Sequence, residues 1–116
     1  SATQATLTWT DNAANETGLT SSTYDVITDF KHLEDDINLQ TIDASSILAG
    51  NNAFVWRSTG AFTTSTSGEL RYKIFNNAGT ANDYTMIYGD TDGDTAAEFQ
   101  IKLTGLVTLT SSDFVF

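Results

Sequence analysis

Two apolar-alternating runs flank an acidic turn in the stretch Tyr84-Thr-Met-Ile-Tyr-Gly-Asp90-Thr-Asp-Gly-Asp-Thr-Ala-Ala-Glu-Phe99-Gln-Ile-Lys-Leu-Thr-Gly105. Alternation with a period of two residues is typical of a strand with one buried face, and Asp-Gly is a strong signal for a hairpin turn. The stretch therefore predicts a β-hairpin with strands over residues 84–89 and 97–103. A two-residue turn at Asp92-Gly93 predicts that Met86 pairs with Phe99 and Tyr84 with Ile101 on one apolar face.

Short strands separated by turn clusters are predicted for the rest of the chain. The clearest is 69–75, which places Leu70, Tyr72 and Ile74 inward and Glu69, Arg71 and Lys73 outward. Residues 43–50 begin with a capping aspartate and end in glycine, which predicts one or two helical turns. Residues 11–23 read as a polar loop. Further strands are predicted over 5–10, with Leu7 and Trp9 on one face, and over 24–30, 37–39, 53–57 and 106–109.

The fold class predicted is all-β. We expect a sandwich or a roll cap of short, mainly antiparallel strands, with at most one or two short helical turns. The 116 residues are 40% hydrophobic and form one domain, 1–116.

Charge and composition exclude several functions. The chain carries 15 acidic against 5 basic residues, for a net charge of −10. Phosphate backbones and anionic lipid would be repelled, so nucleic acid and membrane surfaces are not expected as partners. No apolar run is long enough to cross a bilayer, so membrane insertion is not expected. Cysteine is absent, which excludes disulfides and thiolate chemistry.

Acidic residues supply the candidate metal ligands. Asp90, Asp92 and Asp94 alternate along the hairpin turn and Glu98 follows, a pattern similar to the start of a calcium loop. The EF-hand register is not kept, because Thr95 stands at its sixth position, where glycine is required. The alternative is a turn in which the aspartates accept backbone hydrogen bonds. Glu34-Asp35-Asp36, with Asp29 nearby, forms a second acidic group in which Asp29 and Asp36 are candidate ligands, and a solvated turn is the alternative.

Catalysis has little support in the sequence. His32 is the only histidine and lies in an acidic turn, where we expect a surface residue rather than part of a catalytic triad. Binding through aromatic residues remains open, because Trp9, Trp56, Tyr24, Tyr72, Tyr84 and Tyr88 could stack on sugar rings in an extracellular carbohydrate-binding or adhesive module. Trp56 is the candidate ligand-binding residue. Self-association of threonine-rich edge strands into a fibre is a further alternative.

Several motifs in order resemble the C-terminal domain of the serralysins. They are Asp25-Val-Ile-Thr-Asp-Phe30, Asp36-Ile-Asn-Leu39, Gly68-Glu-Leu-Arg-Tyr72, Gly89-Asp-Thr-Asp-Gly-Asp94 with Glu98-Phe99, Leu103-Thr-Gly105 and Asp113-Phe-Val-Phe116. The resemblance covers residues 24–116, and residues 1–23 add a strand and a polar loop.

This resemblance implies a non-catalytic, extracellular domain that caps a calcium-loaded parallel β-roll of glycine-rich (RTX) nonapeptides and carries an uncleaved signal for type I secretion. The implied partners are the type I secretion machinery and an upstream β-roll or catalytic domain. Asp113, Phe114, Val115 and Phe116 are the implied signal, although the same residues also suit a closing strand packed on the core. With a roll attached, Asp29 and Asp36 would help to close its last calcium site. The chain itself contains neither the nonapeptides nor the zinc-protease motif His-Glu-x-x-His.

Overall fold

The computed structural model describes residues 5–8, 24–77 and 81–116, and for residues 5–8 it describes the strand only. The predicted polar loop and Trp9 lie outside these ranges. The described chain forms β1 (Ala5–Thr8), β2 (Asp25–Ile27), β3 (Asp35–Asn38), β4 (Val55–Trp56), β5 (Glu69–Phe75), β6 (Tyr84–Asp90), β7 (Phe99–Thr104), a single 3-10 turn η1 (Ser111–Asp113) and β8 (Phe114–Val115). The predicted all-β class is confirmed. No helix in the described part is long and apolar enough to span a membrane.

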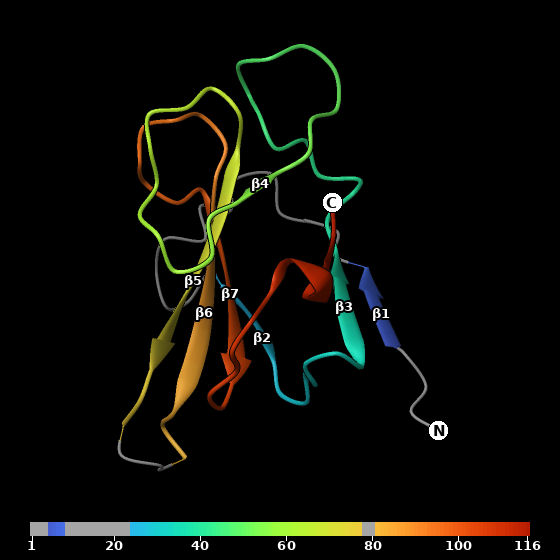
Figure 1. Cartoon of the computed structure of the whole chain (residues 1–116), viewed down its shortest axis with the longest axis vertical. Coiled ribbons are helices and arrows are strands. Elements are labelled where there is room, and N and C mark those ends of the chain that lie inside the picture. The colour runs from blue at the N-terminus through green and yellow to red at the C-terminus, as the bar shows by residue number, and fades with distance from the viewer. Residues whose placement is uncertain (1–4, 9–23, 78–80) are drawn as a thin grey trace.

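The strands form two sheets. One has five strands in the order β2-β7-β6-β5-β4, and the other has three in the order β1-β3-β8. In Figure 1 the strands β5, β6 and β7 lie together on the left, whereas β3 and β1 lie on the right. Antiparallel pairing joins β5 to β6 and β6 to β7, the two long ladders. The four shorter pairings, β1–β3, β2–β7, β3–β8 and β4–β5, are parallel.

The core lies against the inner face of the five-stranded sheet. Leu70 from β5, Ile87 from β6 and Ile101 and Leu103 from β7 are fully buried, and Ile37 from β3 meets them from the smaller sheet. Burying each such side chain stabilises the fold by about 1.5–3 kcal/mol before the loss of chain entropy is counted. The alternation predicted for residues 69–75 is confirmed at Leu70 and Tyr72, which are buried.

The predicted register of the hairpin is wrong. The ladder pairs Met86 with Lys102, Ile87 with Ile101 and Gly89 with Phe99. Every β6 residue therefore meets a β7 residue three positions later than predicted, and Met86 and Ile101 lie on opposite faces. The physical reason is the connection. Glu98 N–H donates to the Gly89 carbonyl at 2.8 Å, so the strands separate after the Gly89–Phe99 pair and an eight-residue loop, 91–98, replaces the two-residue turn.

Three smaller predictions are also wrong. Glu69 is not exposed but 3% accessible, because its carboxylate accepts hydrogen bonds from Thr63 N–H (2.6 Å) and Oγ1 (2.7 Å) and lies 3.6 Å from Arg57 Nε. Residues 43–50 are not helical, since the Asp43 carboxylate accepts Ser45 N–H and the Ser45 hydroxyl accepts the backbone amides of Ile47 and Leu48. Such local hydrogen bonds compete with a helix. Residues 106–109 form no strand.

Candidate functional site

Asp90, the last residue of β6, organises the hairpin loop from inside the protein. Its side chain is 1% exposed. Oδ1 accepts the backbone N–H groups of Asp92 (3.1 Å) and Gly93 (2.8 Å), and Oδ2 accepts that of Thr95 (3.0 Å). These three hydrogen bonds from backbone amides to one buried carboxylate fix the path of the loop. Asp90 therefore accepts backbone hydrogen bonds within its own turn, which is the alternative to a metal ligand.

The other three acidic residues follow the same pattern. Asp92 Oδ1 accepts Asp94 N–H at 3.2 Å, and Asp94 Oδ1 accepts Ala96 N–H at 2.7 Å. Glu98 Oε2 accepts Thr91 N–H at 2.6 Å. Asp92 and Asp94 remain exposed. Each of these three carboxylates uses one oxygen in a backbone hydrogen bond and keeps acceptor capacity on the other.

The four carboxylates converge. One oxygen from each of Asp90, Asp92, Asp94 and Glu98 lies within 4.8 Å of the others. Calcium binds oxygen at about 2.3–2.6 Å, so ligands on opposite sides of one ion are up to roughly 5 Å apart. The oxygen atoms are therefore close enough to share a single calcium-sized cation. Burial raises the pKa of Glu98, and the charges of Asp92, Asp90 and Asp94 raise it further, while the Thr91 amide lowers it.

Neighbouring loops hold the acidic loop against the body of the protein. The Ser46 N–H donates to the Thr91 carbonyl at 2.8 Å. Gly93 has a φ of +74° and lies so close to the Ser65 carbonyl that a Cβ would collide with it. Only glycine satisfies both conditions without strain. The Asp-Gly pair predicted to form the tight turn therefore serves a different purpose, which is close contact between two loops.

Asp113 is buried and connects the turn between β2 and β3 to the segment before β8. Its carboxylate is 0% exposed and lies 2.7 Å from His32 Nδ1 through both oxygens. It also accepts the backbone N–H groups of Leu33 (3.2 Å) and Thr110 (2.8 Å). The contact is a hydrogen bond in the tautomer that has its proton on Nδ1, where His32 donates to the carboxylate. His32 is 34% exposed and fits the expected surface location, but its role as the partner of Asp113 was not foreseen.

The three residues after Asp113 pack into the fold. Phe114 and Val115 form β8, which pairs in parallel with Ile37 and Asn38 of β3. Phe114 is 6% exposed and belongs to the core, and Phe116 stacks on it with ring centroids 5.6 Å apart. The closing-strand alternative for Asp113-Phe-Val-Phe116 therefore describes the folded state. A role of these residues as a signal before folding stays a prediction.

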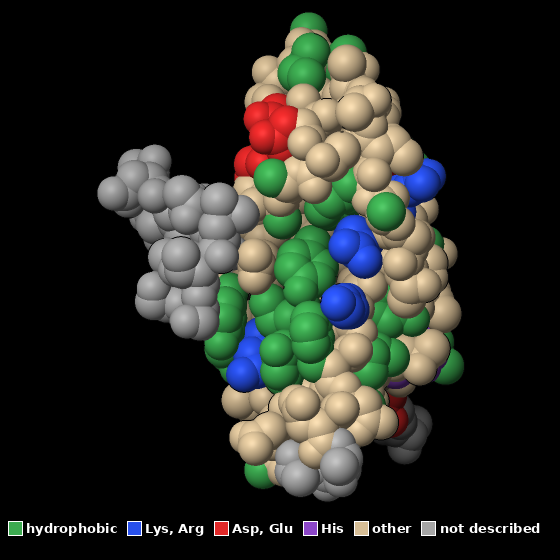
Figure 2. Space-filling model, turned by 90° about the vertical axis from the view of Figure 1, so that its left-hand side faces the viewer, with side chains coloured by type: hydrophobic (Ala, Val, Ile, Leu, Met, Phe, Trp, Pro, Cys, Tyr) green, Lys and Arg blue, Asp and Glu red, His purple; other side chains and the backbone are tan. Residues whose placement is uncertain are grey.

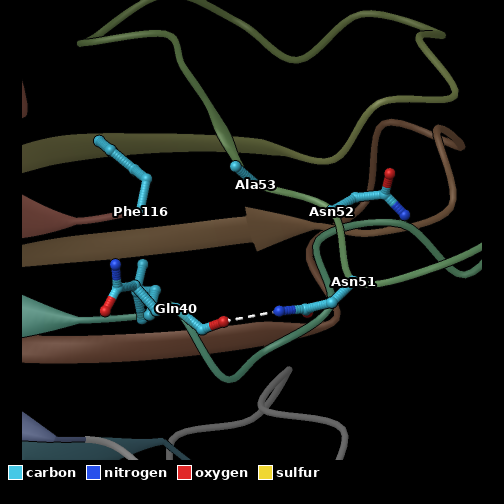
Figure 3. Close-up of a pocket in the computed structure, with 6 residues that line it drawn as sticks. Gln40, Asn51, Asn52, Ala53 and Phe116 are labelled. Atoms are coloured by element: carbon cyan, nitrogen blue, oxygen red, sulfur yellow. Dashed lines mark hydrogen bonds between the residues drawn. The ribbon is translucent and has the colours of Figure 1, made fainter.

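A shallow pocket of about 240 Å³ lies beside Phe116. It is lined by Leu39, Gln40, Asn51, Asn52, Ala53 and Phe116. Figure 3 shows Phe116 and Gln40 toward one side of it and Asn51 and Asn52 toward the other, with Asn51 Nδ2 donating to the Gln40 backbone carbonyl at 2.8 Å. None of the lining side chains is ionisable, so the pocket has no general acid, base or charged nucleophile.

The remaining candidates lie apart from the acidic loop. Asp29 follows β2 and is exposed, and Asp36 lies half-buried on β3. Neither belongs to a group of three or more potential metal ligands among the described residues. Trp56 stacks on Tyr72 at 5.7 Å and contacts Phe114 at 4.9 Å, so its ring lies among core aromatics. Metal binding at Asp29 and Asp36 and ligand binding at Trp56 stay predictions.

Comparison with known proteins agrees with the motifs found in order along the chain. The family model described as "Peptidase M10 serralysin C terminal" matches residues 7–116. A search of curated proteins returned no match. Domains of this family come from secreted proteins, where they form the non-catalytic C-terminal part of M10 serralysin peptidases. The match extends the resemblance from residue 24 back to residue 7, and so includes part of β1. The chain belongs to the serralysin C-terminal domain family.

Proposed function

We propose that this chain is a non-catalytic domain that caps an upstream parallel β-roll in an exported bacterial protein, binds calcium in its acidic loop and carries a type I secretion signal in Asp113, Phe114, Val115 and Phe116. The observation that carries the proposal is the course of the first three strands. β1 lies in the three-stranded sheet, β2 in the five-stranded sheet, and β3 returns to the first sheet parallel to β1. The chain thus begins as one coil of a parallel roll.

The edges left by this coil support the role of a cap. Among the described strands, β1 pairs only with β3, and β2 pairs only with β7, so each ends its sheet. A further parallel coil on the N-terminal side would continue both sheets through these two edges. The other end of the smaller sheet is β8, whereas the five-stranded sheet ends in the two-residue strand β4. Very short edge strands are one way in which proteins avoid unwanted pairing.

Amide hydrogen exchange tests the cap. A calcium-loaded roll of glycine-rich nonapeptides is fused before residue 1, and exchange is compared with that of the free 116-residue chain. We expect the amides of β1 and β2 to gain protection, because they enter new parallel ladders. β4, the edge strand at the far end of the larger sheet, is the internal control and should not change. Protection gained at β4 and not at β1 or β2 would refute the cap.

Calcium binding is supported by the converging carboxylates and is tested by calorimetric titration. We expect heat on addition of calcium and a higher melting temperature, since a ligand that binds only the folded state stabilises it. The double variant Asp92→Asn/Asp94→Asn keeps the two Oδ1 acceptors of the loop but removes two charges, and should bind at least tenfold more weakly. Asp35→Asn/Asp43→Asn removes the same charge outside the loop and should bind normally. Equal losses in the two variants, or no heat at all, would contradict the proposal.

The secretion signal requires a test that separates recognition from folding, because Asp113 is also a structural residue. Asp113→Ala removes the acidic residue of the signal and leaves buried donors without an acceptor, which costs about 1–3 kcal/mol of stability or more. His32→Gln weakens the same contact but leaves residues 113–116 unchanged. We expect Asp113→Ala to lower export through a matching type I system, and His32→Gln to leave it unchanged. Equal export of the two variants would remove Asp113 from the signal.

A further inference from the structure

Basic and aromatic side chains gather on the outward face of the five-stranded sheet. Figure 2 shows hydrophobic and basic side chains side by side across the middle of this surface, with acidic side chains at its upper edge. The strand registers place the members on one face, in rows that cross β5, β6 and β7. We name this surface the basic aromatic face and define it as Tyr24, Arg71, Lys73, Phe75, Tyr84, Met86, Tyr88, Gln100 and Lys102.

The cations of this face lie against aromatic rings. Lys102 Nζ is 4.6 Å from the ring centroid of Tyr84, and Lys73 Nζ is 5.0 Å from that of Phe75. The Arg71 guanidinium lies 5.6 Å from the Tyr88 ring. Such contacts are worth about 0.5–1 kcal/mol each at exposed sites, and they hold the long side chains in place. The positive charges are therefore ordered before any ligand arrives, which lowers the entropy cost of binding.

No described carboxylate neutralises these charges. The ion pairs found in the described part of the chain involve Lys31, His32 and Arg57, which leaves Arg71, Lys73 and Lys102 without an acidic partner within 4.0 Å in those ranges. Arg71 Nε is buried and has no hydrogen-bond acceptor among the residues that the structure describes. Three of the five basic residues of a chain with net charge −10 thus share one face. Positive charge is therefore concentrated on this face although the protein as a whole is acidic, which favours an anionic ligand there.

A shallow pocket opens in the middle of the face. It measures about 240 Å³ and is lined by Tyr24, Phe75, Tyr84, Met86, Tyr88, Gln100 and Lys102. Met86 is 5% exposed, and the rings around it are half-buried. One cross-strand row contains Lys73, Met86 and Lys102. The Cα atoms of the two lysines are therefore roughly 10 Å apart, which is two strand spacings. The pocket therefore combines an apolar lining with hydroxyl, amide and ammonium donors.

We propose that the basic aromatic face binds an acidic polysaccharide, a chain of sugars that carry carboxylates. The apolar faces of a sugar ring would contact Met86 and the tyrosine rings, hydroxyls would bond to Gln100 and the tyrosines, and carboxylates would pair with Lys73, Lys102 and Arg71. Burial raises the pKa of Tyr88, so its hydroxyl stays a donor. This binding is independent of the roll cap, the calcium loop and the secretion signal.

The chemistry favours a polysaccharide over other anions. Acidic peptides usually bind by adding a strand to a free edge or a helix to a groove, but β5, β6 and β7 each have a neighbouring strand on both sides. Nucleic acid and anionic membranes present dense charge over large areas, which the acidic remainder of this protein would repel. A uronic-acid chain carries fewer charges per unit length than nucleic acid, and a short segment of it can lie along one face of the protein. At physiological salt, screening confines its repulsion by the acidic residues elsewhere on the protein to about 8 Å.

Affinity electrophoresis and calorimetry with three polymers test this proposal. The 116-residue chain is titrated at 0.15 M NaCl, without calcium, with polygalacturonate, neutral dextran and poly-glutamate. We expect binding to polygalacturonate only. Lys73→Gln/Lys102→Gln should weaken it at least tenfold, and Tyr88→Phe several-fold. Lys31→Gln, the matched control on an exposed cation paired with Glu34, should bind like the native chain. Melting curves confirm that each variant is folded.

Every other result overturns the proposal. Binding of poly-glutamate with affinity equal to that of polygalacturonate would assign the face to an acidic protein. Binding of dextran with the same affinity would make the charges irrelevant. Equal losses of affinity in Lys31→Gln and in Lys73→Gln/Lys102→Gln would reduce the effect to net charge. Absence of binding together with a dimer in sedimentation would assign the face to a second copy of this chain.

Discussion

At the scale of the residue, the chain uses carboxylates as structural acceptors more than as reactive groups. Asp43, Asp90 and Asp113 each accept two or more backbone N–H groups. The Asn52 and Ser45 amides hold the pKa of Asp43 below its ordinary value. Asp43 therefore stabilises the fold above that value, and the contribution is lost as pH falls through its folded-state pKa. Glu98 is the exception, because its pKa is raised.

The variant Glu98→Gln should show that Glu98, unlike Asp43, lowers the stability of the fold at neutral pH. A raised pKa means that the folded state binds the proton more tightly than the unfolded chain, so in the absence of calcium Glu98 lowers stability as pH rises from 4.5 through the raised value. Glutamine removes that effect and keeps the acceptor for Thr91. We expect a higher free energy of unfolding at pH 7, by less than about 1 kcal/mol because solvent screens the site, and a flatter pH profile in urea denaturation. Glu34→Gln, which removes a charge elsewhere, controls for net charge. An unchanged profile would contradict the electrostatic account.

At the scale of the element, clear alternation predicted the strands but not their partners. The alternation over residues 69–75 predicts a strand with the same bounds as β5, because seven residues with a period of two strongly favour an extended segment. The register of the hairpin and the state of residues 43–50 were missed for one reason. Asp90, Asp43 and Ser45 replace backbone hydrogen bonds with side-chain ones, and propensity does not report such bonds. The His32–Asp113 contact spans 81 residues, beyond any local pattern.

Gly89→Ala should destabilise the hairpin through the ring of Phe99. Gly89 pairs with Phe99 at the last rung before the loop, and a Cβ there would collide with the Phe99 ring. We expect a loss of about 1–3 kcal/mol in the free energy of unfolding, as for overpacking in a core. A double-mutant cycle with Phe99→Leu checks the cause, because the smaller side chain should reduce the cost of Gly89→Ala. The same cost in both backgrounds would mean that backbone conformation, not the ring, requires glycine.

At the scale of the whole molecule, opposite charges are separated in space. The acidic loop lies beyond the ends of β6 and β7, and the basic aromatic face lies on the outward side of the same strands. One hairpin therefore presents an anionic site at its tip and a cationic site on its face. Calcium bound in the acidic loop would not occupy the basic aromatic face, so the two proposed sites can be tested separately.

The excess of negative charge makes the stability of the calcium-free protein depend on salt. Self-repulsion in a chain of net charge −10 opposes the compact state, and salt screens it. Raising NaCl from 0.02 to 0.5 M should increase the melting temperature of the native chain by a few degrees. The same salt increase should raise the melting temperature of Asp92→Asn/Asp94→Asn less than that of Asp35→Asn/Asp43→Asn, because the first variant has already lost the most crowded charges. Millimolar calcium should still stabilise the native chain at 0.5 M NaCl, where screening is nearly complete, since a bound ion acts through ligand contacts. If calcium adds nothing at high salt, its effect at low salt is general screening and the acidic loop is only a self-capped turn.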